Sequence, residues 1–128
     1  SHEMDWNDFD YGQYDVMADM LMDKYPDIDG IFAADMVAIA CIRQLLKRKK
    51  KVPRDVKVVA YDGTYVAKVG VMNLTVVQQP IEELAKSAVN ILLNMMQGKK
   101  YHNKKAFFEP SLLYGDTTYN KDKIEFEN

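Results

Sequence analysis

The spacing of hydrophobic and polar positions along the chain predicts three main helices. Apolar residues recur at intervals of three and four in residues 11–24, 36–47 and 81–97, which gives each segment a face suited to burial. Pro80 opens the third segment and Gly98 closes it, in line with the preferences of helix ends. Each of these helices therefore needs an apolar surface on which to pack.

Short runs of β-branched and other apolar residues between the helices predict strands. These runs are residues 31–34, 58–60 and 74–77, and after the third helix residues 106–108 and 111–114. The run at residues 58–60 has no polar alternation, which is typical of a strand in a parallel sheet that is covered on both faces. The pattern indicates an α/β fold.

Polar side chains follow two of the predicted strands. The turn Tyr61-Asp62-Gly63-Thr64 comes directly after residues 58–60, and Gln79 follows residues 74–77. In open α/β sheets, ligands bind in the crevice at the carboxyl ends of the strands. Asp62 and Gln79 are therefore expected to point into one ligand site.

The segments VVAYDGT and LTVVQQP, followed by a long helix, carry a family resemblance. They resemble the effector-binding region of the lactose-repressor/galactose-repressor (LacI/GalR) family of bacterial transcription regulators, whose core is similar to periplasmic sugar-binding proteins. The resemblance implies an α/β fold, namely a partial parallel-sheet, Rossmann-like lobe of the periplasmic-binding-protein-like fold with three main helices. It also implies that Asp62 and Gln79 hydrogen-bond sugar hydroxyls, with Tyr61 of the same turn in the effector site.

Two further residues are candidates for effector contacts, and each has a structural alternative. Trp6 falls near the aromatic residue that stacks on the effector in this family, but a large aromatic is more often half buried by its neighbours. Asp35 follows the strand at residues 31–34, where the family has Asn-Asp and this chain has Ala34-Asp35. Asp35 is then either an effector contact or only the N-cap of the helix that begins at Met36.

The predicted helix at residues 36–47 is more apolar than packing on a sheet requires. Between residues 36 and 46 its only polar residues are Arg43 and Gln44, so a second face also needs a cover. The resemblance implies that this face belongs to a homodimer contact. The alternative is a neighbouring helix of the same chain.

Composition and charge narrow the class of protein. A formal net charge of −2 gives no overall attraction to nucleic acid or to an anionic membrane surface, and no apolar run has membrane-spanning length. The basic run at residues 47–51 fits a helix end, where cations complement the dipole; contact with phosphates is the alternative. The single Cys41 excludes an internal disulfide and fits a reducing compartment such as the cytoplasm.

The sequence contains few residues in patterns typical of enzyme active sites. His2 and His102 lie in predicted loops away from Cys41, so neither a zinc site nor a Cys-His pair is expected. No glycine-rich phosphate loop precedes a helix, and no cofactor is expected. One alternative remains, in which Asp35 and Asp62 act as paired carboxylates that bind magnesium.

The resemblance implies part of a cytoplasmic, sugar-responsive repressor. Residues 1–118 are expected to be the C-terminal part of its effector domain, with residues 81–97 crossing to the other lobe and residues 119–128 as a polar tail. The expected partners are a small carbohydrate, a second copy of the chain, and operator DNA bound through an N-terminal helix-turn-helix that this chain lacks. The alternative is a fragment of an extracytoplasmic sugar-binding protein of an ABC transporter, which shares the fold.

Overall fold

The computed structural model describes residues 12–68, 70, 72–100 and 105–119 of the 128-residue chain. The helices are α1 (Gly12–Lys24), α2 (Asp35–Lys47), the short 3-10 helix η2 (Tyr65–Lys68) and α3 (Ile81–Met96). The strands are β1 (Gly30–Ala34), β2 (Lys57–Asp62), β3 (Thr75–Gln78) and β4 (Ser111–Leu113). Each of the three main helices begins and ends within one residue of its predicted bounds. Trp6, His2, His102 and the predicted tail from residue 120 onward lie outside the described residues.

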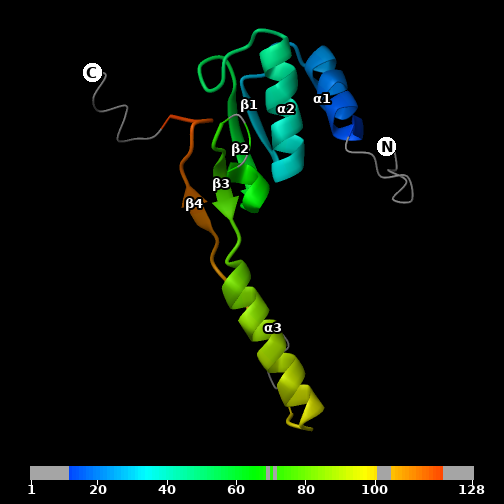
Figure 1. Ribbon diagram of the computed structural model, residues 1–128, viewed down its shortest axis with the longest axis vertical. Coiled ribbons are helices and arrows are strands. Elements are labelled where there is room, and N and C mark those ends of the chain that lie inside the picture. Colours follow the sequence, from blue (N-terminus) through cyan, green and yellow to red (C-terminus); the bar gives the residue numbers. More distant parts are fainter. Residues whose placement is uncertain (1–11, 69, 71, 101–104, 120–128) are drawn as a thin grey trace.

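The strands form one sheet in the order β1-β2-β3-β4 (Figure 1). β1, β2 and β3 are parallel. The chain returns from the end of β1 to the start of β2 through α2, and from the end of β2 to the start of β3 through the segment that contains η2. β4 returns after α3 and pairs antiparallel with β3. The predicted α/β fold with a mostly parallel sheet is confirmed.

One predicted strand does not form. Residues 106–108 have no strand structure, and Phe107 is 91% exposed. The last pair between β3 and β4 joins Gln78 to Ser111, so residues 106–108 run beyond the carboxyl end of β3, where the described residues provide no strand to pair with. The β-forming composition of this segment was therefore misleading, because a strand also needs a ladder partner.

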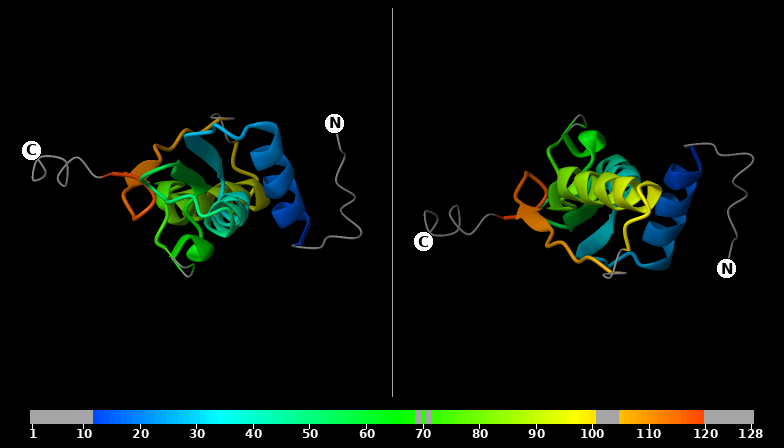
Figure 2. Two further views of the ribbon diagram at one scale, coloured as in Figure 1. Left: turned by 90° about the horizontal axis from the view of Figure 1, so that it is seen from above. Right: turned by 90° about the horizontal axis from the view of Figure 1, so that it is seen from below.

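In the described part of the chain, helices cover only one face of the sheet. Val58 and Ala60 of β2 are fully buried and belong to one hydrophobic core with residues of α2. Figure 2 shows the ribbon of α2 beside the sheet. On the opposite face Val59 is only half-buried and Phe32 of β1 is 66% exposed. The prediction that residues 58–60 are covered on both faces is therefore wrong for the described residues, since no helix among them lies over that second face.

The second face of α2 is covered by α1, a neighbouring helix of the same chain. Arg43 Nη2 of α2 lies 3.0 Å from Asp15 Oδ1 of α1. Arg48, directly after α2, binds Asp19 at 2.6 Å and Asp23 at 2.7 Å. Arg48 of the basic run thus lies next to the end of α2, as the helix-end interpretation predicts. Its pairing with carboxylates of α1 was not predicted.

A shallow hollow remains beside α2 on the side of η2. It is lined by Ile39, Ile42, Arg43, Leu46, Gly70, Met72 and Leu74. Leu46 at its rim is 42% exposed. Exposed apolar surface of α2 thus remains at Leu46, and a homodimer contact at α2 stays a prediction.

α3 extends away from the sheet and from the other two helices (Figure 1). None of its residues is buried. Its apolar residues Ile81, Leu92 and Met95 are between 53% and 61% exposed. The predicted amphipathic helix is therefore present, but its apolar stripe has no cover among the described residues.

Candidate functional site

The structure brings Asp62 and Gln79 together at the carboxyl ends of β2 and β3. The side-chain amide of Gln79 donates a hydrogen bond from Nε2 to Asp62 Oδ1, with a distance of 2.6 Å. The backbone N–H of Gln79 also donates to the Asp62 carbonyl oxygen at 3.1 Å. Both residues are half-buried. A carboxylate and an amide therefore lie side by side at the edge where parallel sheets bind ligands.

The turn that carries Asp62 has an unfavourable backbone conformation. Asp62 has a φ of 100° and Gly63 a φ of 71°, so two consecutive residues have positive φ. Such a conformation in a residue other than glycine costs on the order of 1–3 kcal/mol and tends to persist where a functional site requires it. A residue other than glycine does not fit at position 63, because its Cβ would lie 2.6 Å from Gln78 Cγ and 2.8 Å from Gln78 Cα.

Asp35 lies behind this turn, and its carboxylate accepts three hydrogen bonds from the turn. The donors are the backbone N–H of Gly63 at 3.3 Å, the backbone N–H of Thr64 at 2.7 Å and Thr64 Oγ1 at 2.6 Å. Asp35 is only 3% exposed. Both of its oxygens thus accept hydrogen bonds from the turn that follows β2.

The prediction that Asp35 is the N-cap of α2 is wrong. Asp35 is the first residue of the helix, and the cap position belongs to Ala34, which makes no side-chain capping bond. The carboxylate is directed to the neighbouring strand end because β1 and β2 are adjacent and parallel, so their carboxyl ends meet. The sequence carries one signal for this contact, namely an aspartate directly after one strand and a glycine turn directly after the next, but periodicity alone did not predict it.

The paired-carboxylate alternative gains no support from this geometry. Asp35 is bonded to the turn, while Asp62 is bonded to Gln79. In the part of the chain that the structure describes, no group of three or more His, Cys, Asp or Glu side chains could hold a metal ion. None of the described helices is long and apolar enough to cross a membrane.

Tyr61 lies on the open face of the sheet beside the turn. Its ring packs edge-to-face on Phe32, with ring centroids 6.2 Å apart and an interplanar angle of 70°. Tyr61 is 38% exposed. Phe32 was not singled out by the sequence, although the strand register places it on the same face of the sheet as Tyr61. The aromatic candidate Trp6 lies outside the described residues.

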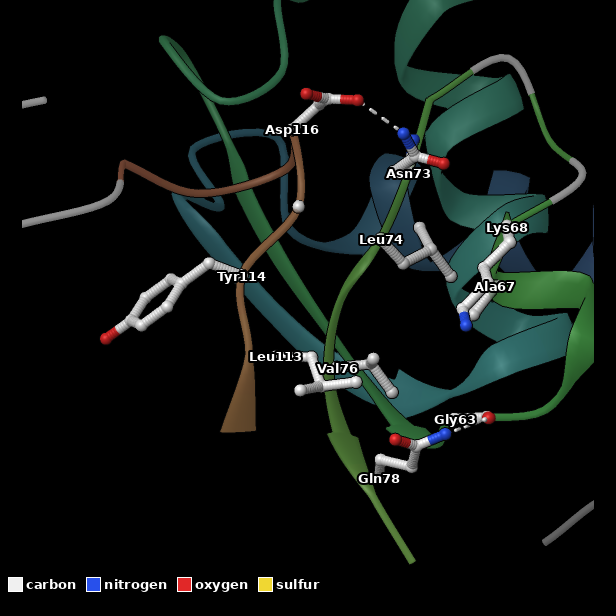
Figure 3. Close-up of a pocket in the computed structure, with 11 residues that line it drawn as sticks. Gly63, Ala67, Lys68, Asn73, Leu74, Val76, Gln78, Leu113, Tyr114 and Asp116 are labelled. Carbon is white, nitrogen blue, oxygen red and sulfur yellow. Dashed lines mark hydrogen bonds between the residues drawn. The ribbon is translucent and has the colours of Figure 1, made fainter. Parts of the chain in front are cut away.

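A cavity of about 450 Å³ lies next to the site, between η2, β3 and β4 (Figure 3). Its lining residues are Gly63, Ala67, Lys68, Asn73, Leu74, Val76, Gln78, Leu113, Tyr114, Gly115 and Asp116. At its lower end Gln78 Nε2 donates a hydrogen bond to the Gly63 carbonyl oxygen at 3.2 Å (Figure 3). Asp62 and Gln79 do not line this cavity, so the candidate site lies at the sheet edge next to it.

Comparison with known proteins identifies relatives along most of the chain. Residues 2–118 match the sequence profile of the periplasmic binding protein-like domain. The HTH-type transcriptional regulator CelR of Thermobifida fusca is 31% identical over 84% of this chain and 32% of that protein. The ribose operon repressor of Halalkalibacterium halodurans is 28% identical over 92% of this chain and 36% of that protein. The chain thus spans about a third of the length of these curated relatives.

Solved structures agree with the sequence relatives. The complex of the regulator CelR with cellobiose superimposes with a TM-score of 0.77 at 30% identity, over 86% of this chain and 34% of that chain. A LacI-type transcription regulator from Bifidobacterium animalis subsp. lactis gives a TM-score of 0.79 at 25% identity, over 86% of this chain and 40% of that chain. The resemblance carried by VVAYDGT and LTVVQQP is confirmed. The chain belongs to the periplasmic binding protein-like domain family, and the relatives that it resembles are transcriptional regulators of the LacI family.

Proposed function

We propose that this chain is the effector-sensing part of a sugar-responsive LacI-type repressor, and that Asp62 and Gln79 bind the sugar. The observation that carries this proposal is the hydrogen-bonded pair of Asp62 and Gln79 on a turn with two consecutive positive φ angles. The regulator CelR, which has a similar fold, is known in complex with cellobiose. A small carbohydrate is the effector class that this likeness supports.

The two side chains complement each other as sugar ligands. A carboxylate only accepts hydrogen bonds, whereas a side-chain amide both donates and accepts. Neighbouring sugar hydroxyls can therefore donate to Asp62 and exchange hydrogen bonds with Gln79. Tyr61 offers part of an aromatic ring beside them, and Trp6 is proposed as a second aromatic platform.

The remaining parts of the proposal follow from the family. Residues 1–118 form the C-terminal part of the effector domain, α3 crosses to the other lobe, and residues 119–128 are a tail. The whole protein is cytoplasmic, binds operator DNA through a helix-turn-helix outside this chain, and forms a homodimer in which α2 contributes. It is not an enzyme. The named curated relatives are regulators, which favours this proposal over a fragment of a transporter's sugar-binding protein.

A titration of the isotope-labelled chain with cellobiose and with ribose, followed by NMR, tests the sugar site. We expect weak binding, because a single lobe leaves the other side of the sugar in water. Shift changes should be confined to residues 61–64 and 78–80 and to Trp6. Asp62→Ala should weaken binding by roughly tenfold or more, since a hydrogen bond to a charged group contributes about 1.5–3 kcal/mol.

The matched control is Asp116→Ala, which removes an exposed carboxylate near the opposite end of β3. It should leave the affinity for the sugar unchanged. Sugar binding that is equally strong in wild type and Asp62→Ala, or shift changes that avoid the turn, would contradict the assignment.

A further inference from the structure

The turn that carries Asp62 is held from two sides by side chains at the carboxyl ends of the two neighbouring strands, β1 and β3. On one side the buried carboxylate of Asp35, at the end of β1, accepts hydrogen bonds from Gly63 and Thr64. On the other side the amide of Gln78, at the end of β3, donates to the Gly63 carbonyl oxygen. The two polar groups of the Gly63 backbone are thus bonded to two different strand ends.

These hydrogen bonds offset the free-energy cost of the backbone conformation of the turn. Two consecutive positive φ angles at Asp62 and Gly63 are unfavourable for a free chain, so surrounding contacts must hold them. The successive N–H groups of Gly63 and Thr64 both point to Asp35, which forms a concave anion-binding turn around that carboxylate. A carboxylate that is 3% exposed also needs these donors, because burial without them is costly.

We infer that Asp35 is a positioning residue for the pair of Asp62 and Gln79, and that it acts through Thr64. Gln78 has the same role from the side of β3. Asp35 acts without contacting the effector, because its carboxylate is buried behind the turn and bonded to it. The consequence for sugar affinity rests on the proposed function, whereas the effect on the turn does not.

Thr64 gives the sharpest test, because it is exposed and its hydroxyl can be removed without emptying the core. In the full 128-residue chain, Thr64→Val removes one of the three hydrogen bonds to Asp35. We expect amide hydrogen exchange at Gly63 and Thr64 to become roughly tenfold faster, which corresponds to the loss of about one hydrogen bond. The NMR signals of the Gln79 side-chain amide should shift, while the melting temperature stays close to that of wild type.

Thr64→Ser is the matched control, because serine keeps the hydroxyl. It should restore both slow exchange and the wild-type Gln79 signals. A general loss of stability would instead lower the melting temperature and affect amides throughout the sheet. Unchanged exchange and unchanged Gln79 signals in Thr64→Val would overturn the inference, as would a Thr64→Ser variant that behaves like Thr64→Val.

Asp35→Asn perturbs the same contact more strongly. Asparagine has nearly the size and shape of aspartate, so the substitution changes only the hydrogen bonding and the charge. The asparagine NH₂ group is a donor and would face the donors of the turn, so we expect a larger effect than that of Thr64→Val. Asp29→Asn, an exposed position just before β1, controls for the loss of a negative charge. If Asp35→Asn does not fold, the two Thr64 variants decide.

Binding of cellobiose separates this inference from the proposed function. If the wild-type chain binds cellobiose, Thr64→Val should weaken binding about threefold to tenfold, which is at most the loss of one hydrogen bond. An unchanged affinity would overturn the positioning role. If the wild-type chain binds neither cellobiose nor ribose, the proposed sugar site fails, and the exchange rates and Gln79 signals still decide whether Asp35 holds the turn.

Discussion

Helices α2 and α3 are both rich in apolar residues, yet they have opposite surroundings. Seven of the thirteen residues of α2 are buried between the sheet and α1, whereas none of the sixteen residues of α3 is buried. Leu45 in α2 is 1% exposed, and Leu92 in α3 is 57% exposed. A leucine at similar helical spacing is thus buried in the core in α2 and exposed to solvent in α3.

This difference shows that an apolar stripe predicts the need for burial but not its partner. Burying a leucine, isoleucine or methionine side chain contributes about 1.5–3 kcal/mol. The buried side chains of α2 gain this free energy by packing within the chain. The exposed Ile81, Leu92 and Met95 of α3 do not gain it. An apolar stripe of this kind is typical of a surface that meets another lobe or another chain, which agrees with the proposal that α3 crosses to a second lobe.

The largest expected effect of a substitution is at the centre of α2. Leu45→Ala should lower the free energy of unfolding by about 2–5 kcal/mol, because it leaves a cavity in the core. Leu92→Ala removes the same atoms from α3 and should change the free energy of unfolding of the monomer by less than about 0.5 kcal/mol. Urea denaturation followed by circular dichroism measures both. Equal losses at the two positions would mean that α3 is packed in solution.

The next effect is on self-association through α3. At tens of micromolar the chain should form dimers or larger species, because pairing covers the exposed stripe, and exchange of a helix between copies is a low-cost route. Leu92→Glu should shift the mass measured by light scattering on a size-exclusion column towards the monomer.

Asn90→Glu is the control for this experiment, since it adds the same charge at another exposed position of α3. It should leave the mass as in wild type. A wild-type chain that elutes as a monomer, with a melting temperature unaffected by Leu92→Glu, would contradict the prediction, because the stripe would then have no cover from the chain or from a second copy.

Most of the fold was predictable because it depends on local patterns. Periodicity located the three main helices, and apolar runs located four strands. The failure at residues 106–108 has a non-local cause: whether an apolar run becomes a strand depends on a neighbouring strand at the same level, and β3 ends at Gln78. The sequence also did not decide what covers the second face of α2, because periodicity cannot distinguish a helix of the same chain from a second copy of the chain.

The candidate site was predictable only in part. The rule that ligands bind at the carboxyl ends of parallel strands was enough to place Asp62 beside Gln79. The hydrogen bonds from Gly63 and Thr64 to Asp35 depend on the positive φ angles of the turn, which turn both N–H groups towards β1. A sequence gives no direct measure of that backbone path, so it left Asp35 as either an effector contact or the N-cap of α2 and did not indicate its contact with the turn.

The smallest expected effect concerns the ion pair between α1 and α2, for which α3 has no counterpart among the described residues. The hydrogen bond from Arg43 lowers the pKa of Asp15 below its ordinary value of 3.8, and burial opposes this only in part. A carboxylate whose pKa is lowered in the folded state stabilises that state above the ordinary pKa, and this stabilisation is lost as the pH falls through the lowered pKa. Asp15→Asn should therefore lower the melting temperature slightly at pH 7, and the difference from wild type should disappear in acid. Because the pair is partly exposed, added salt should reduce the difference at pH 7 as well.

Melting curves of wild type and Asp15→Asn at pH 7 and in acid, at low and high salt, measure these differences. A difference that persists unchanged in acid would show that Asp15 stabilises the contact between α1 and α2 by packing and not by charge.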